Sequence, residues 1–161
     1  MWAPWRMAYV SAEHDHEFEG PRCVFCELPA LGDDARALIL DRGDHCFVVL
    51  NAYPYASGHL MVVPFAHVDR LTDLDAPARA EMMELARMAQ EVVSGAMSPH
   101  GFNLGMNQGA AAGAGIADHL HLHLVPRWNG DTNFMTSTGD VRVMPQSLEE
   151  TYAALRPGFG A

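Results

Sequence analysis

The order of apolar and polar positions from residue 45 to 64 predicts two short strands. The run Cys46-Phe47-Val48-Val49-Leu50 is wholly apolar, as is typical of a buried strand, and residues 51–58 after it are dense in turn formers. A second run, His59-Leu60-Met61-Val62-Val63, is apolar after its first residue and lies between Gly58 and Pro64. Because the connecting loop is short, we expect the two strands to pair antiparallel.

A longer segment, 76–97, carries apolar residues at intervals of three and four and places its charged residues on the opposite side. This period predicts an amphipathic helix, and we interpret its four methionines as core filling. Asp75 suits the N-cap, with Pro77 just inside the first turn, and the pair Ser98-Pro99 ends the helix.

Four further segments complete the pattern. Residues 102–107 alternate as a strand does, and 108–117 form a loop rich in glycine and alanine. A last strand is expected from 118 to 125, closed by Pro126, and a short helix from 147 to 155.

With 161 residues, 49% of them apolar, the whole chain (1–161) is expected to form a single domain with its own core. Residues 1–44 show little regular pattern and are predicted to be an irregular arm that carries a cysteine pair. The candidate chemistry lies in a core over 45–135, and 136–161 is a tail with a helix. No apolar run reaches the roughly 18 residues of a membrane span, and the start lacks the regions of a secretory signal, so we expect a cytoplasmic protein.

The charged residues and cysteines exclude several classes of function. A net charge of −10 disfavours binding to nucleic-acid phosphates and to anionic membranes. All ten basic residues are arginine, so reactions that need a lysine ammonium have no candidate residue. Cys23 and Cys26, two of only three cysteines, are a poor disulfide framework and fit a metal pair or a redox pair better.

Residues 119–125 read His-Leu-His-Leu-His-Leu-Val, which is a strict alternation. In a strand it directs three imidazoles to one face and the leucines to the other. Alternate strand residues lie about 7 Å apart, so the row could hold a metal or work along a di- or triphosphate. Gly113 and Gly115 let backbone N–H groups of the preceding loop converge on an anion, although such a loop is often only a flexible connector.

The segment 108–127 resembles the signature of the histidine triad (HIT) family, His-φ-His-φ-His-φ-φ, where φ is apolar. Its continuation over 126–134 is more similar to the fragile-histidine-triad and diadenosine-tetraphosphate phosphorylase branch than to the nucleoside phosphoramidases. The start, 4–9, resembles bacterial members, and the likeness covers about residues 2–155. It implies an α+β HIT-like fold with an antiparallel sheet of about five strands, one long and one short helix, and a homodimer.

The resemblance implies a role for each histidine of the site. His121 would be the nucleophile that attacks the α-phosphorus of a nucleotide and forms a nucleotidyl-histidine intermediate. His123 would contact the α-phosphate and stabilise charge on the leaving side, and His59 would be the fourth active-site histidine. A neutral imidazole is nucleophilic near pH 7, so this chemistry needs no metal.

The resemblance also implies the nucleotide contacts. Asn51 matches a polar residue that binds ribose, and Gln108 a glutamine that binds phosphate; either could instead be a plain turn residue. Backbone contacts to phosphate would come from Ala114, Gly115, Ile116 and Ala117. Many relatives carry Ser or Thr where this chain has Ile116, so a hydroxyl donor is missing, which speaks against the phosphoramidase reaction.

A zinc site is implied by the same resemblance. Some HIT members and the related hexose-phosphate uridylyltransferases complete such a site with two histidines, which here gives the ligand set Cys23, Cys26, His67 and His119. A closed set of this kind would be structural. The alternatives are a metal-free cysteine pair, or His45 or His100 as a substitute ligand.

The expected function is hydrolysis or phosphorolysis of dinucleoside polyphosphates such as diadenosine tetraphosphate, or of related nucleotide conjugates. Whether water or inorganic phosphate is the acceptor stays open. The rival is a non-enzymatic zinc-binding or nucleotide-sensing module, which leaves the offsets of Asn51 and Gln108 unexplained. Trp2, Trp5 and Trp128 could stack on a base or serve core and dimer contacts.

Overall fold

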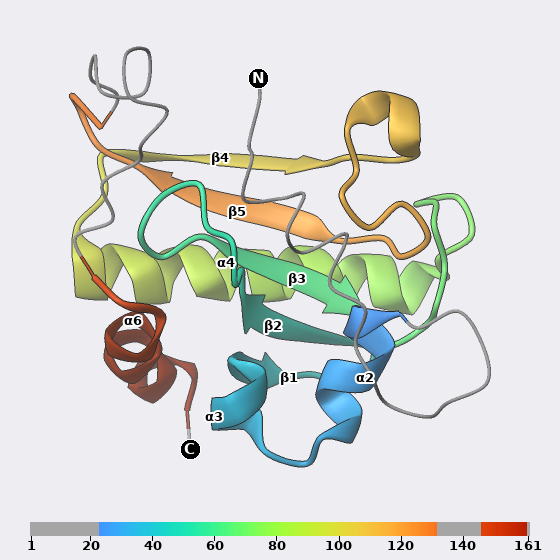
Figure 1. The fold of residues 1–161 in the computed structure, drawn as a ribbon, viewed down its shortest axis with the longest axis horizontal. Coiled ribbons are helices and arrows are strands. Elements are labelled where there is room, and N and C mark those ends of the chain that lie inside the picture. Colours follow the sequence, from blue (N-terminus) through green and yellow to red (C-terminus); the bar gives the residue numbers. More distant parts are fainter. Residues whose placement is uncertain (1–22, 132–145, 161) are drawn as a thin grey trace.

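The computed structural model describes residues 23–131 and 146–160, which form an antiparallel sheet with helices packed on both faces (Figure 1). Expectations for Trp2 and Trp5 lie outside these ranges. The described sheet has five strands in the order β1-β2-β3-β5-β4, as predicted in number. They are β1 (Ile39–Arg42), β2 (Cys46–Leu50), β3 (Leu60–Pro64), β4 (Gly101–Met106) and β5 (Leu122–Arg127).

The two apolar runs form the hairpin β2–β3. The register runs from Cys46 opposite Pro64 to Leu50 opposite Leu60. Side chains with even numbers in β2 enter one core cluster and those of Phe47 and Val49 enter a second cluster on the other face. Both faces are therefore covered, which explains why these strands are apolar throughout.

Helix α4 (Ala76–Met97) covers one face, and its bounds are those that the period predicts (Figure 1). The side chain of Asp75 caps it by accepting a hydrogen bond from the N–H of Ala78. Its buried residues join the inner side of β2, β3 and β5 in the larger core cluster. The amphipathic pattern thus decides which face of the helix meets the sheet.

The C-terminal helix α6 (Leu148–Leu155) and the 3-10 helix η2 (Arg156–Phe159) pack beside α4. Ser147 and Glu150 form a reciprocal capping box at the start of α6. The predicted short helix over 147–155 is therefore confirmed. None of the described helices is long and apolar enough to cross a membrane.

The opposite face is covered by segments for which we predicted no regular structure. Residues 24–42 of the expected irregular arm contain α2 (Val24–Ala30), α3 (Asp34–Ala37) and β1, so the expectation is wrong for this part. Helices of seven and four residues are too short to show a period, and Pro29 inside α2 argues against a helix. They form because Phe25 and Ala37 are buried in the second core cluster.

The last strand begins and ends later than predicted. β5 starts at Leu122 and continues through Pro126, whereas we expected a strand over 118–125. β3 pairs only with residues 122–124 of β5, so the missing N–H of Pro126 interrupts no ladder with β3. Before the strand, the N–H of Leu120 donates to the carbonyl of Val68 in the loop after β3. The segment just before β5 is therefore hydrogen-bonded to this loop and lies outside the sheet ladder.

Candidate active site

The three histidines of the alternating row lie at and just before the start of β5. The leucines at 120, 122 and 124 point into the core beneath α4, as the alternation predicts. The side chains of His119 and His121 are almost completely buried, with 1% and 4% exposure. The rings of His121 and His123 are 4.8 Å apart and nearly perpendicular. The row is therefore one connected array on the face that carries α2.

One hydrogen bond sets the proton position on His121. Its Nδ1 lies 2.8 Å from the backbone carbonyl oxygen of His119. A carbonyl oxygen only accepts, so Nδ1 carries the proton and donates it. In the neutral ring the lone pair is then on Nε2, which makes Nε2 the nucleophilic atom.

His59 and His123 form a second hydrogen-bonded pair. The backbone N–H of Tyr55 donates to Nδ1 of His59 over 3.0 Å, so the proton of a neutral His59 is on Nε2. That Nε2 lies 3.0 Å from Nδ1 of His123 and donates to it. A neutral His123 therefore holds its own proton on Nε2. The site pairs a lone pair on His121 with an N–H donor on His123.

Asn51 belongs to the same turn as His59. Its Nδ2 is 3.3 Å from Nδ1 of His59, and its Oδ1 accepts a hydrogen bond from the N–H of Tyr53 over 2.9 Å. The backbone N–H of Asn51 donates to the carbonyl of His59. These bonds close the loop 51–59 and bring Asn51 beside the histidine pair.

Gln108 is placed differently. Its Oε1 accepts a hydrogen bond from the backbone N–H of Leu71 over 3.0 Å, which ties the start of the glycine-rich loop to the loop after β3. The 3-10 turn η1 (Ala110–Ala112) follows. Ile116 packs against the second core cluster, while Gly115 is exposed. An apolar side chain at position 116 thus has a packing role.

Two aromatic side chains at the site were missed by sequence reasoning. Tyr55 stacks on His59 with ring centroids 4.7 Å apart. Phe25 contacts both His119 and His121, with centroids 5.5 and 5.1 Å apart. Tyr55 lies in a stretch that the sequence predicts as a turn, and Phe25 lies in the expected irregular arm. No sequence pattern therefore identifies either ring as part of the site.

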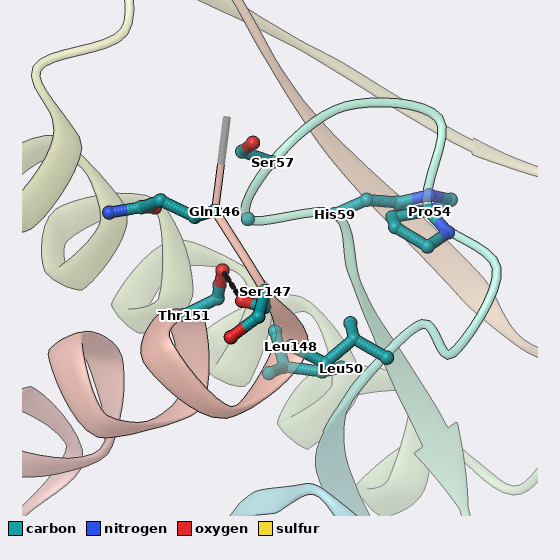
Figure 2. A pocket seen from close by; sticks show the side chains of 9 residues that line it. Leu50, Pro54, Ser57, His59, Gln146, Ser147, Leu148 and Thr151 are labelled. Atoms are coloured by element: carbon teal, nitrogen blue, oxygen red, sulfur yellow. Dashed lines mark hydrogen bonds between the residues drawn. The ribbon is translucent and has the colours of Figure 1, made fainter. Parts of the chain in front are cut away.

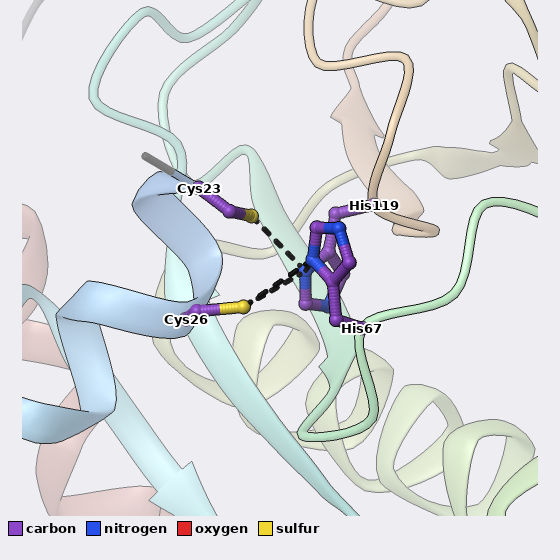
Figure 3. Close-up of side chains that lie close together, drawn as sticks. All are labelled: Cys23, Cys26, His67 and His119. Atoms are coloured by element: carbon purple, nitrogen blue, oxygen red, sulfur yellow. Dashed lines mark hydrogen bonds between the residues drawn. The ribbon is translucent and has the colours of Figure 1, made fainter. Parts of the chain in front are cut away.

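The side chains of four residues gather into one cluster, Cys23, Cys26, His67 and His119 (Figure 3). Nδ1 of His119 lies 3.2 Å from Sγ of Cys23, 3.6 Å from Sγ of Cys26 and 3.2 Å from Nδ1 of His67. Sγ of Cys26 lies 3.4 Å from Nδ1 of His67. A tetrahedral metal with bonds of about 2.0–2.3 Å would space its ligand atoms by about 3.3–3.8 Å. These four atoms could therefore bind one metal ion.

The surroundings of the cluster favour that use. Nε2–H of His119 donates to the carbonyl of Pro64 over 2.9 Å, which leaves Nδ1 unprotonated on the side of the thiols. The alternative ligands, His45 and His100, are not in the cluster. Nδ1 of His100 accepts a hydrogen bond from the N–H of Asn129.

Burial shifts the pKa values of two side chains in the cluster toward their neutral forms. Burial lowers the pKa of His119 below its ordinary value, so its ring is neutral near pH 7. Burial, with the hydrogen bond and charge of Cys23, raises the pKa of the Cys26 thiol to about 11. Two thiols this close resist joint ionisation unless a cation lies between them.

A cavity of about 250 Å³ adjoins the loop 51–59 on the side of α6 (Figure 2). It is lined by Leu50, Pro54, Ser57, Gly58, His59, Gln146, Ser147, Leu148 and Thr151. Ser57 is 8% exposed, and its Oγ has no hydrogen-bond partner among the described residues. The sequence pattern did not indicate this cavity, because its two walls are about ninety positions apart.

Comparison with known proteins finds the HIT domain over residues 34–130. The chain is 43% identical to an AP-4-A phosphorylase of Mycobacterium tuberculosis over 155 residues, which are 94% of this chain and 79% of the relative. A Zn-bound histidine triad family protein from Mycobacterium smegmatis has a TM-score of 0.69 at 29% identity, covering 85% of this chain and 92% of that one. A hypothetical histidine triad nucleotide-binding protein from Sulfolobus tokodaii, at 23% identity and a TM-score of 0.69, shares the fold over 85% and 91% of the two chains.

The span of the matched domain is more than half of the chain and contains the histidine row, His59, Asn51 and Gln108. The fold, the row and the relatives agree with one another. This protein therefore belongs to the HIT family.

Proposed function

We propose that the protein transfers the nucleotidyl group of a dinucleoside polyphosphate, such as diadenosine tetraphosphate, through a covalent intermediate on His121. The observation that carries this proposal is the hydrogen bond from Nδ1 of His121 to the carbonyl of His119, because it puts the lone pair on Nε2. The relative named AP-4-A phosphorylase supports the substrate class.

In the first step Nε2 of His121 forms a bond to the α-phosphorus. The bond from that phosphorus to the bridging oxygen breaks, and its electron pair departs with the leaving nucleoside polyphosphate. A polyphosphate anion is a stable leaving group near pH 7, so the step needs no proton donor, and the N–H on Nε2 of His123 stabilises the departing charge by a hydrogen bond. His59 keeps the proton of His123 on Nε2.

In the second step an acceptor oxygen bonds to the phosphorus, and the electron pair of the P–N bond returns to Nε2 of His121. Water as acceptor releases a proton to solvent and gives a nucleoside monophosphate. Inorganic phosphate as acceptor gives a nucleoside diphosphate. The second product therefore separates a hydrolase from a phosphorylase.

In this proposal Asn51 binds the ribose, and its place beside His59 supports that role. Gln108 and the backbone of residues 114–117 bind phosphate. Because Oε1 of Gln108 accepts from Leu71, its amide N–H₂ group is the donor for a phosphate oxygen. Ile116 has no hydroxyl, so backbone N–H groups must supply the other contacts of this loop.

The cluster of Cys23, Cys26, His67 and His119 holds a structural Zn²⁺ in this proposal. The spacing of the ligand atoms and the Zn-bound relative from M. smegmatis support zinc. A closed Cys₂His₂ set leaves no open position for substrate, so zinc would supply folding free energy and no chemistry.

We also infer a homodimer formed through β4. In the described sheet β4 pairs only with β5, and Leu104 on it is 39% exposed. Two such edges can satisfy each other's backbone groups. Leu104→Arg should shift the sedimentation coefficient toward the monomer, and an unchanged coefficient would contradict a β4 interface. A cytoplasmic location and the absence of nucleic-acid and membrane partners stay predictions from the sequence.

Intact-protein mass spectrometry after brief, acid-free quenching with diadenosine tetraphosphate tests the covalent step. We expect an adenylyl adduct in the wild-type protein and in His45→Ala, but none in His121→Ala. His45 is an exposed histidine outside the metal cluster, which makes it the matched control. His121→Ala should keep its metal, because His121 is not in that cluster.

Product analysis with and without inorganic phosphate completes the test. ADP formed only when phosphate is present would identify a phosphorylase, and AMP formed without it a hydrolase. An adduct that survives in His121→Ala would contradict the nucleophile. Absence of both adduct and product with several dinucleoside polyphosphates would refute the proposed function.

A further inference from the structure

Phe25 joins the metal cluster to the nucleophile. It lies on α2 between Cys23 and Cys26 and is 3% exposed. Its ring centroid is 5.1 Å from that of His121 and 5.5 Å from that of His119. A single side chain thus touches both the nucleophilic histidine and a histidine of the cluster.

We propose that Phe25 is a positioning residue that holds the imidazole of His121 in its reactive tautomer and orientation. This inference rests on the proposed function of His121 as nucleophile. Through Phe25, the turn of α2 that carries the two cysteines would affect the reaction without contacting the substrate.

The need for such a residue follows from the chemistry of imidazole. Only the tautomer with its proton on Nδ1 has a lone pair on Nε2, and in water the two tautomers interconvert readily. Rotation of the ring about Cβ–Cγ would also exchange Nδ1–H for a C–H group at the carbonyl of His119. The 2.8 Å hydrogen bond must therefore be protected from water and from ring rotation.

Phe25 supplies that protection by packing. Its ring is inclined by 46° to the imidazole of His121, and the ring of His123 meets the same imidazole at 78°. These two contacts restrict rotation of the His121 ring. The apolar ring of Phe25 also keeps water away from the hydrogen bond that Nδ1–H of His121 donates to the carbonyl of His119, and a drier environment strengthens that hydrogen bond. His121 is accordingly 4% exposed.

The position of Phe25 depends in turn on the cysteine pair. The N–H of Cys26 donates to the carbonyl of Cys23 over 3.0 Å, which fixes the turn that contains Phe25. The thiols of both cysteines reach the cluster from this turn. A metal bound there would hold the backbone of Phe25 from both sides, so loss of metal and loss of the ring should disturb the same imidazole.

The test compares Phe25→Leu with Phe47→Leu, the same substitution at a buried phenylalanine of the same core cluster whose ring partner is Phe65. Long-range ¹H–¹⁵N spectra of labelled histidines report the tautomer of His121 without any substrate. We expect Phe25→Leu alone to lose the pure Nδ1–H pattern. Its rate of adenylyl-enzyme formation should fall about tenfold to a hundredfold with KM unchanged, as expected for a misplaced reacting atom.

Native mass spectrometry measures the metal content of both variants, so that their rates are compared at equal metal content. If Phe25→Leu folds poorly, Phe25→Met, which keeps an apolar side chain but removes the ring, replaces it. A wild-type tautomer pattern in the folded variant, or a rate loss equal to that of Phe47→Leu, would overturn the proposal. If the protein forms no adduct with any nucleotide, the proposed function fails, while the tautomer spectra still decide whether Phe25 positions His121.

Discussion

Replacing Gly58 with alanine should destabilise the protein, whereas the same replacement at Gly95 should stabilise it. Gly58 precedes His59 at the end of the loop 51–59 and has a φ of +73°. An alanine Cβ there would lie 2.7 Å from Sδ of Met97. Gly95 lies in α4, and a Cβ added to it meets nothing within 4 Å. The two sites therefore separate backbone conformation from the general effect of adding a methyl group.

The left-handed conformation costs an L-residue about 1–2 kcal/mol. The contact with Met97 adds little, because a thioether at the end of a flexible side chain can move. We thus expect Gly58→Ala to lower the free energy of unfolding by about 1–2 kcal/mol, or Tm by roughly 2–8 °C. Gly95→Ala should raise the free energy by about 0.5–1 kcal/mol, the usual gain of alanine over glycine in a helix.

Urea unfolding followed by circular dichroism measures both changes. Repeating Gly58→Ala in a Met97→Ala background removes the steric contact, and most of the loss should persist if the backbone angle causes it. A Gly58→Ala variant as stable as the wild type would refute the reasoning. So would a loss that disappears entirely in the Met97→Ala background.

Three further predictions concern residues away from the reacting atoms. Glu81→Ala should lower the free energy of unfolding by about 1–3 kcal/mol, because one carboxylate oxygen of Glu81 accepts hydrogen bonds from the N–H groups of His45 and Cys46. Glu81→Gln keeps an acceptor and should lower it by less, so equal losses in urea unfolding would contradict this prediction. Ser147→Ala should cost about 0.5–2 kcal/mol and speed amide hydrogen exchange in α6 by removing the capping box, so unchanged exchange rates would count against it. Burial raises the pKa of the Cys46 thiol to about 12, so little of it is thiolate at about pH 8. Peptide mapping after alkylation at that pH should find Cys46 unlabelled in the folded protein, and labelling as fast as in urea would contradict this prediction.

Sequence reasoning succeeded where a period repeats several times or where a cap has a specific chemistry. The helix 76–97 has six turns of one pattern and a capping aspartate, and both its ends were predicted. The alternation in 119–125 likewise predicted that the leucines enter the core. The cluster of cysteines and histidines followed from the family resemblance, since no local pattern relates Cys23 to a histidine 96 positions away.

Predictions failed where tertiary packing decides the outcome. The helices in 24–37 owe their existence to Phe25 and Ala37, which bury against strands that come later in the chain. The start of β5 is delayed because residue 120 bonds to the loop after β3, a partner that periodicity cannot specify. The ring contacts of Tyr55 and Phe25 depend in the same way on the folded position of α2 and the turn 51–59.

The hydrogen-bond partners that place the protons on His59 and His121 are main-chain groups. The tautomer of His59 is chosen by the N–H of residue 55, and that of His121 by the carbonyl of residue 119. Almost every amino acid carries a backbone N–H and a backbone carbonyl, so replacing the side chain leaves both groups in place. An alanine scan therefore does not detect their contribution. Only a change of the backbone itself, such as proline or an ester linkage at position 55, removes the N–H donor. Side-chain replacement at 55 or 119 thus keeps this donor and this acceptor, whereas on our proposal the contact of Phe25 keeps the ring of His121 aligned with its acceptor.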